Sequence, residues 1–266
     1  MMKMDVQTKL VPNRLLTVVL VGWVLVGAFL LDIPAASADI ILENTRSRAA
    51  ITRVGSDLKK SLVEGGFRWG APMFIRIFKE KKRLEVWLAK GGAFRLFKSY
   101  PICAYSGGLG PKLRNGDLQA PEGFYFVTPG RFNPGSDYHL SFNIGYPNAY
   151  DRAHDRTGSY IMVHGQCVSI GCFAMATGPL GGGAARNRPI EEIWTLADAA
   201  FRSGQQFFRV HIFPFMLTEK NLERHAGSKW ITFWRNLKQG YDHFEKSKRP
   251  PDTVVRAKRY VFAEDR

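Results

Sequence analysis

The hydrophobic pattern divides the chain into an N-terminal helical part and a longer part with the two-residue period of β-strands. An amphipathic helix is predicted over about residues 43–64, ending at Gly65-Gly66, because apolar residues recur there at intervals of three and four. From Pro72 onward, short apolar runs are separated by turn residues and charges, as is typical of strands. These runs predict strands at residues 73–78, 84–88, 94–97, 99–105, 123–128, 138–144, 159–164 and 207–213.

Two further helices are predicted nearer the C-terminus. The first begins around residues 186–189 and carries two glutamates in its first turn, where the helix dipole favours acidic side chains. The second is marked by an aromatic stripe from Trp230 to Phe244 and is ended by Pro250-Pro251. Core packing explains both apolar faces, and the basic tail after Pro251 is expected to be loosely held. The chain is therefore expected to be mainly β with flanking helices, an α+β protein.

Two stretches between the predicted strands have distinctive compositions. The charge cluster at residues 79–83 is expected to be a solvated hairpin turn. The glycine-rich residues 106–112 lack both the Gly-Lys-Ser/Thr ending of phosphate loops and the glycine spacing of dinucleotide sites, so we expect a loop that rims a cleft. Asp117, Asp151 and Asp155 lie in turn-like contexts, where aspartate normally caps the backbone.

The N-terminus has the order of an export signal. Three cations precede an unbroken apolar run over residues 15–31, and Pro34 and Ala36-Ser37-Ala38 follow. This order predicts a signal peptide over residues 1–38, cleaved after Ala38. The alternative is an uncleaved inner-membrane anchor, because the apolar run is at the short limit for a membrane span. Under both interpretations the rest of the chain is exported.

The formal net charge of +15 favours polyanionic partners, such as nucleic acid, anionic lipid or an acidic wall polymer. Lysine and arginine are scattered along the sequence, and no nucleic-acid-binding motif accompanies them, so we expect no nucleic acid partner. A hydrophobic content of 45% excludes a disordered protein.

The chemistry-bearing residues concentrate around His164 and three cysteines, Cys103, Cys167 and Cys172. In an oxidising compartment, three cysteines leave at least one thiol unpaired within the chain. Cys172 can act as a nucleophile with His164 as its base, since each lies beside a glycine. Alternatively, His164, Cys167 and Cys172 can bind zinc, with His139 or His154, although their spacing matches no common zinc finger or ribbon. The third possibility is a structural disulfide with a buried thiol.

Several motifs resemble the L,D-transpeptidases, which have a YkuD-type catalytic domain. His164-Gly165 followed by Ser169-Ile170-Gly171-Cys172 resembles the His-Gly and Ser-x-Gly-Cys signature of that family. The resemblance extends to a YafK-like branch of the family and covers roughly residues 70–250. Its further motifs are Tyr105-Ser106-Gly107-Gly108-Leu109-Gly110-Pro111-Lys112, Pro121-Glu122-Gly123, Asn143-Ile144-Gly145-Tyr146-Pro147-Asn148-Ala149-Tyr150-Asp151-Arg152-Ala153-His154, Phe233-Trp234 and Gly240-Tyr241-Asp242.

The resemblance implies a flattened β-sandwich or barrel with an N-terminal helix and a C-terminal helical extension. We expect an amphipathic helix and linker over residues 39–69, a catalytic domain over 70–216, and a helical extension with a basic tail over 217–266. Members of the family work outside the cytoplasmic membrane, so the resemblance implies a periplasmic enzyme. Its expected partner is peptidoglycan, whose stem peptides contain diaminopimelate. No cofactor and no metal are implied.

The resemblance also assigns roles to residues. Cys172 would be the nucleophile and His164 the general base, oriented by the backbone carbonyl of Gly165. The backbone N–H groups of Gly171 and Cys172 would hold the oxyanion. Substrate-binding candidates in the cleft are Ser169, His139, His154 and Lys112, and the two histidines are equally well explained as hydrogen-bonded structural residues.

Two departures from the common family pattern bear on the reaction. Only eight positions separate His164 from Cys172, so the loop between them is shorter than usual in the family, and Ala174 stands where arginine or asparagine is usual. Both features match the YafK-like branch, which is associated with hydrolysis of the amide between diaminopimelate and the outer-membrane lipoprotein. The alternatives are a transpeptidase that forms 3-3 cross-links or attaches protein to peptidoglycan, and a non-catalytic wall-binding or zinc-stabilised module. If Cys103 pairs with Cys167, Cys172 stays free and reactive, whereas a Cys167–Cys172 disulfide would keep the enzyme inactive until it is reduced. We expect Cys172 to be free.

Overall fold

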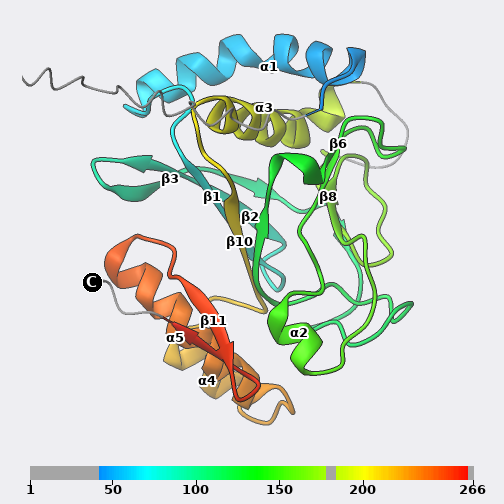
Figure 1. Cartoon of the computed structure of the whole chain (residues 1–266), viewed down its shortest axis with the longest axis vertical. Coiled ribbons are helices and arrows are strands. Elements are labelled where there is room, and N and C mark those ends of the chain that lie inside the picture. Colours follow the sequence, from blue (N-terminus) through cyan, green and yellow to red (C-terminus); the bar gives the residue numbers. More distant parts are fainter. Residues whose placement is uncertain (1–41, 178–183, 263–266) are drawn as a thin grey trace, which may run out of the picture. The chain divides into compact units, whose positions relative to one another are not determined.

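Two five-stranded sheets form the centre of the protein in the computed structural model, which describes residues 42–177 and 184–262 (Figure 1). The first sheet has the order β3-β2-β1-β10-β5 and the second the order β4-β9-β8-β7-β6. The strands are β1 (Met73–Phe78), β2 (Arg83–Lys90), β3 (Ala93–Pro101), β4 (Ala104–Tyr105), β5 (Gly123–Val127), β6 (Phe132–Asn133), β7 (Ser141–Asn143), β8 (Met162–His164), β9 (Phe173–Ala174) and β10 (Phe208–Phe213). The expected export signal lies outside the described residues.

Five helices and one hairpin accompany the sheets in the described part of the chain. The helices are α1 (Thr45–Glu64), α2 (Ala149–Ala153), α3 (Arg188–Arg202), α4 (Glu219–Arg224) and α5 (Ile231–Ser247), and the hairpin is formed by β11 (Thr253–Arg256) and β12 (Arg259–Phe262). None of the helices in residues 42–177 and 184–262 is long and apolar enough to cross a membrane. Short 3-10 turns occur at Pro129–Arg131 and Ala184–Asn187.

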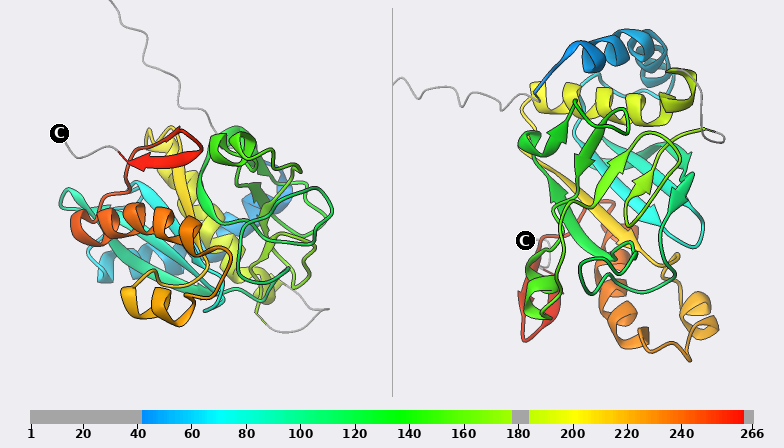
Figure 2. Two further views of the ribbon diagram at one scale, coloured as in Figure 1. Left: turned by 90° about the horizontal axis from the view of Figure 1, so that it is seen from below. Right: turned by 90° about the vertical axis from the view of Figure 1, so that its right-hand side faces the viewer.

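The main hydrophobic core lies between the two sheets and continues to α1 and α3, which pack side by side (Figures 1 and 2). The ring of Phe142 in β7 lies 5.7 Å from that of Phe208 in β10, so the sheets are in direct contact. α1 begins at a capping box, in which Asn44 accepts a hydrogen bond from the Ser47 N–H and Ser47 Oγ accepts one from the Asn44 N–H. These features confirm the expected α+β sandwich with an N-terminal helix.

A second core forms on the other face of the first sheet. All six residues of β1 are buried. Because alternate side chains of a strand point in opposite directions, both faces of β1 must be covered. Ile75 and Ile77 join the main core, whereas Phe74 and Phe78 point to α5, where they contact Phe244 and Tyr241. The C-terminal part of the chain therefore completes a core that the first sheet alone leaves uncovered.

Two predictions are wrong, and a third is wrong for one residue. The tail after Pro251 forms the β11–β12 hairpin, and Tyr260 is buried and exchanges two hydrogen bonds with Asn236 of α5. The charge cluster forms the expected hairpin turn between β1 and β2, with Glu80, Lys81 and Lys82 exposed, but Lys79 is completely buried beside Glu122. The separate strands predicted at 94–97 and 99–105 are largely one strand, β3, which contains a bulge opposite β2.

The second sheet is built from shorter strands than the sequence predicts. β7 and β8 contain three residues each, within the predicted stretches 138–144 and 159–164. β9, which immediately follows Cys172, was not predicted. Two-residue strands have too little hydrophobic alternation to be recognised in a sequence.

Candidate active site

Cys172 and His164 line the same cavity, which has a volume of about 460 Å³. The cavity is bordered by β8, by the loop before β9 and by the loop over residues 112–118. Of the glycine-rich residues 106–112, which we expected to rim a cleft, only Lys112 lines it. Apolar side chains with large exposed fractions stand around it, namely Leu118, Tyr138, Tyr160 and Ile170.

The parallel pairing of β8 with β9 brings the two candidate catalytic residues together. Val163 pairs with Phe173 and His164 pairs with Ala174, and the side chains of Val163 and Phe173 are both buried in the core. Since neighbouring residues of a strand point to opposite faces, His164 and Cys172 point to the other face, toward the cavity. Cys172 directly precedes the first paired residue of β9 and lies diagonally across from His164.

The geometry of His164 fixes which ring nitrogen carries the proton. Its Nδ1 is hydrogen-bonded to the carbonyl of Gly165, which can only accept, so Nδ1–H is the donor and Nε2 is left unprotonated. His164 is 2% exposed, and burial lowers the pKa of its imidazole from the ordinary value, whereas the hydrogen bond to the Gly165 carbonyl raises it. Its ring lies 4.9 Å from that of Tyr138. At pH 7 the imidazole is therefore neutral and able to accept a proton at Nε2.

The Cys172 thiol is polarised by two backbone groups. Its Sγ accepts a hydrogen bond from the Met162 N–H at 3.4 Å, and the S–H donates to the Tyr160 carbonyl at 3.7 Å. Burial raises the pKa of Cys172, while the Met162 N–H and the charge of Lys112 act in the opposite direction. The resting pair is thus a neutral thiol and a neutral imidazole, and ionisation of the thiol requires a base.

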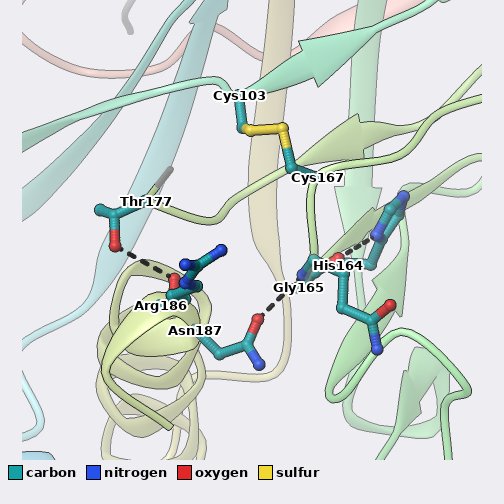
Figure 3. The surroundings of a disulfide bond; sticks show 8 residues. Cys103, His164, Gly165, Cys167, Thr177, Arg186 and Asn187 are labelled. Atoms are coloured by element: carbon teal, nitrogen blue, oxygen red, sulfur yellow. Dashed lines mark hydrogen bonds between the residues drawn. A yellow bond between two sulfur atoms is a disulfide. The ribbon is translucent and has the colours of Figure 1, made fainter. Parts of the chain in front are cut away.

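A disulfide joins the other two cysteines (Figure 3). Cys103 is bonded to Cys167 with a Cα–Cα distance of 5.5 Å, and Cys172 is free, as expected. The bond ties the loop between His164 and Cys172 to the segment before β4, and the Gln166 N–H donates to Asn187 Oδ1 at the start of α3. Because Cys167 is taken by the disulfide, the zinc set of His164, Cys167 and Cys172 is not formed. No group of three potential metal-binding side chains occurs elsewhere among the described residues.

Ser169 organises the turn that precedes Cys172. Its Oγ donates to the Cys172 carbonyl at 2.8 Å, accepts from the Gly171 N–H at 3.2 Å and lies 3.0 Å from Ser106 Oγ. Gly171 has a φ of +143°, a conformation that favours glycine. The Gly171 N–H, one of the two expected oxyanion donors, is thus held by Ser169 in the resting structure.

Gly165 is required by close packing. A Cβ at this position would lie 2.7 Å from the Tyr138 carbonyl and 2.8 Å from Asn187 Oδ1, so a larger residue would displace the carbonyl that orients His164. Glycine is therefore dictated here by sterics, in addition to the role that the family resemblance gives its carbonyl.

Of the remaining substrate-binding candidates, one lines the cavity and two do not. Lys112 lines the cavity and is held by Asp117 and by the Arg114 carbonyl. His139 and His154 do not line it. His139 is hydrogen-bonded to Glu191 at 2.7 Å, and His154 to the Lys258 carbonyl at 2.8 Å.

Sequence reasoning missed several residues of the cavity. Tyr138 and Tyr160 border it, and Met162 supplies the backbone N–H that contacts the Cys172 thiol. Tyr160 also has a left-handed backbone conformation, with a φ of +54°. The only sequence signal for these residues was their position just before or within a short predicted strand, which does not distinguish a cavity wall from a core.

Alkylation of the native protein is expected to label Cys172 alone, and slowly at neutral pH. Because burial raises the pKa of this thiol, the labelling rate should continue to rise above the pKa of an ordinary cysteine, about 8.5. Peptide mapping after iodoacetamide treatment at several pH values measures both results. A rate that already levels off below pH 7 would show a resting thiolate and contradict the neutral pair.

No protein-family model matches the chain. Among solved structures, it is similar to the helical cell shape determining protein Pgp2 from Campylobacter jejuni, with 19% identity, a TM-score of 0.40 and coverage of 74% of this chain and 79% of that chain. The structure of Bd1075 from Bdellovibrio bacteriovorus gives 19% identity, a TM-score of 0.37 and coverage of 70% and 77%.

Two relatives have a higher sequence identity to the chain than these solved structures. The chain is 43% identical over 217 residues to the protein named "Putative L,D-transpeptidase YafK" from Escherichia coli strain K12, and the match covers 82% of each chain. The protein of the same name from Escherichia coli O157:H7 gives the same values. Identity at this level over most of both chains shows that the chain belongs to the L,D-transpeptidase family.

Proposed function

We propose that the protein is an exported cysteine enzyme that cleaves peptidoglycan stem peptides at diaminopimelate through a thioester. The observation that carries this proposal is the placement of a free Cys172 thiol and a neutral His164 imidazole in one cavity, on the same face of the β8–β9 pair. The Cys103–Cys167 disulfide supports it, because it leaves Cys172 as the unpaired thiol. We place this catalytic unit within residues 70–216, in the periplasm, behind the export signal or membrane anchor at residues 1–38.

The first half of the reaction forms the thioester. His164 Nε2 takes the proton of the Cys172 thiol as Sγ attacks the carbonyl carbon at diaminopimelate. The charge that develops on the carbonyl oxygen is stabilised by the backbone N–H groups of Gly171 and Cys172, once the substrate oxygen replaces Ser169 Oγ as the acceptor for Gly171. The C–N bond then breaks, and the protonated Nε2 gives its proton to the leaving amine.

The second half resolves the thioester with water or with an amine. Water attacks the thioester carbon while His164 takes its proton, and the thiol leaves as Cys172 S–H is restored. An amine acceptor would instead give a new amide, which is transpeptidation. We favour hydrolysis of the amide that joins diaminopimelate to the outer-membrane lipoprotein. The short loop fixed by the disulfide and the buried Ala174, which offers no polar side chain beside His164, support the branch associated with that reaction.

Incubation of the purified protein with sacculi that carry bound lipoprotein tests the proposal. We expect release of lipoprotein into the supernatant, together with muropeptides whose diaminopimelate carboxyl is free. Muropeptide analysis by mass spectrometry, with the Cys172→Ala protein as control, measures both products. New 3-3 dimers without released lipoprotein would show a transpeptidase. The absence of both products would reject the proposal that the protein acts on this substrate.

A further inference from the structure

A second cavity, of about 440 Å³, shares no lining residue with the one that contains Cys172. It is lined by residues of β5, β10, α2 and the β11–β12 hairpin, and α2 lies beside β11 (Figure 1). No role described above uses this cavity, which we call the aromatic cleft. Its lining residues include Phe126, Phe207, Arg209, His211, Val254 and Tyr260.

His211 supplies the aromatic cleft with an unpartnered polar group. The residue is 1% exposed, and neither of its ring nitrogens has a hydrogen-bond partner among the described residues. Phe74 and Phe124 lie edge-on to the ring, each with a centroid distance of 4.6 Å, and burial lowers the pKa of His211 well below its ordinary value. A neutral imidazole offers one donor and one acceptor, and leaving both unsatisfied when buried is unfavourable. A ligand that carries a hydroxyl or an amide and reaches the ring can pair with one of these nitrogens.

Two exposed aromatic rings flank the same cleft. Phe126 is 46% exposed and Phe207 is 40% exposed, and their rings meet edge-on at 5.8 Å. Each ring is held by a guanidinium, from Arg131 at 4.6 Å and from Arg209 at 5.1 Å. Exposed, oriented aromatic rings beside polar groups are characteristic of a binding surface.

The charged residues that line the aromatic cleft favour an uncharged ligand. Arg209 is paired with Asp252, and both line the cavity, so the two formal charges cancel. A hexose ring has apolar C–H faces that fit aromatic walls and hydroxyl or amide edges that fit a neutral imidazole. We infer that the aromatic cleft binds an N-acetylated sugar of the glycan strand, apart from the cavity that contains Cys172. The choice of a glycan rests on the proposed function, because the stem peptides of that substrate hang from such sugars.

Titration with a β-1,4-linked trimer of N-acetylglucosamine tests the inference. The full-length Cys172→Ala protein should bind the trimer saturably in calorimetry, and Phe126→Ala or Phe207→Ala should weaken the Kd at least tenfold. Both rings are exposed, so these variants should fold. Leu96→Ala, at a residue of β3 that is 45% exposed and absent from the cleft, is the matched control and should bind as tightly as the parent. His211→Phe should lose binding and remain folded, because it removes an unsatisfied group.

Binding that is absent, or unchanged in the phenylalanine variants, would overturn the inference, as would equal competition by a sugar-free stem peptide. The catalytically active protein separates this failure from failure of the proposed function. Phe126→Ala should lower the ratio of turnover on intact sacculi to turnover on sugar-free stem peptides. Turnover without trimer binding would overturn only the inference that the aromatic cleft binds a sugar. Trimer binding without turnover of either substrate would support that inference and reject the proposed enzymatic function.

Discussion

Replacement of Cys172 by alanine is expected to lower muropeptide turnover by at least about 10⁴-fold, because loss of a nucleophile that acts together with its base removes most of the catalytic power. The fold should be unaffected. Cys172 is only partly buried, and its loss removes one weak backbone contact to Met162 and one to Tyr160, so the free energy of unfolding should fall by about 1 kcal/mol or less. Single-turnover assays and thermal unfolding of the same preparation measure the two effects.

The paired variant Cys103→Ala/Cys167→Ala is the matched control. It removes two cysteines and the disulfide but keeps Cys172, so it should lose about 2–4 kcal/mol of stability and retain measurable turnover. Opposite behaviour of the two proteins would separate a chemical role of Cys172 from a structural one. If Cys172→Ala kept its activity while the paired variant lost it, the thioester mechanism would be rejected.

Elements with strong local patterns could be predicted from the sequence. α1, β1, β10 and α5 each have enough residues for the period of their hydrophobic positions to be recognised. The candidate catalytic pair could be found because its signature lies within nine consecutive residues, from His164 to Cys172. Spacing alone left the zinc and structural interpretations open, and it could not choose the disulfide partner of Cys167.

The features that the sequence did not disclose depend on partners far away in the chain. The apposition of His164 and Cys172 rests on parallel pairing between two strands of three and two residues. The β11–β12 hairpin is held by Asn236, 24 positions from Tyr260. The sequence reading of His211 as part of an ordinary strand could not reveal that neither of its ring nitrogens has a partner among the described residues. In each case the contacts that decide the structure are non-local, so the local sequence pattern could not predict them.

Lys79 is the clearest example of such a non-local contact. A lysine in a charged turn is normally solvated, yet Lys79 Nζ donates to the carbonyls of Gly110 and Ala120 and to Glu122, which is 43 positions away. Glu122 in turn accepts from the Gly110 N–H at 2.7 Å and from the Trp234 indole at 2.8 Å. The pair therefore joins the end of β1, the glycine-rich stretch and α5. All three donors of the ammonium are used, which is how a buried charge can be tolerated.

Replacement of Lys79 by methionine is expected to destabilise the protein by about 3–5 kcal/mol, because it leaves the buried Glu122 carboxylate without its counter-ion. Denaturant unfolding measures the loss. Lys81→Met is the matched control, since Lys81 is exposed in the same turn and its loss should cost about 0.5 kcal/mol or less. The double variant Lys79→Met/Glu122→Gln should recover part of the loss by removing the unpaired charge.

Replacement of Lys79 by methionine should also affect the reaction, because Lys79 holds the loop that follows Gly110. Lys79 holds both Gly110 and Ala120, and the residues between these two anchors include Lys112 and Leu118, which line the cavity with Cys172. At a temperature where the variant remains folded, we expect a higher KM for stem peptides, with kcat changed less, because the chemical pair on β8 and β9 is not touched. Equal stability of Lys79→Met and Lys81→Met would show that the ion pair does not hold this loop. A loss confined to kcat would instead place the effect of Lys79 at His164 or Cys172.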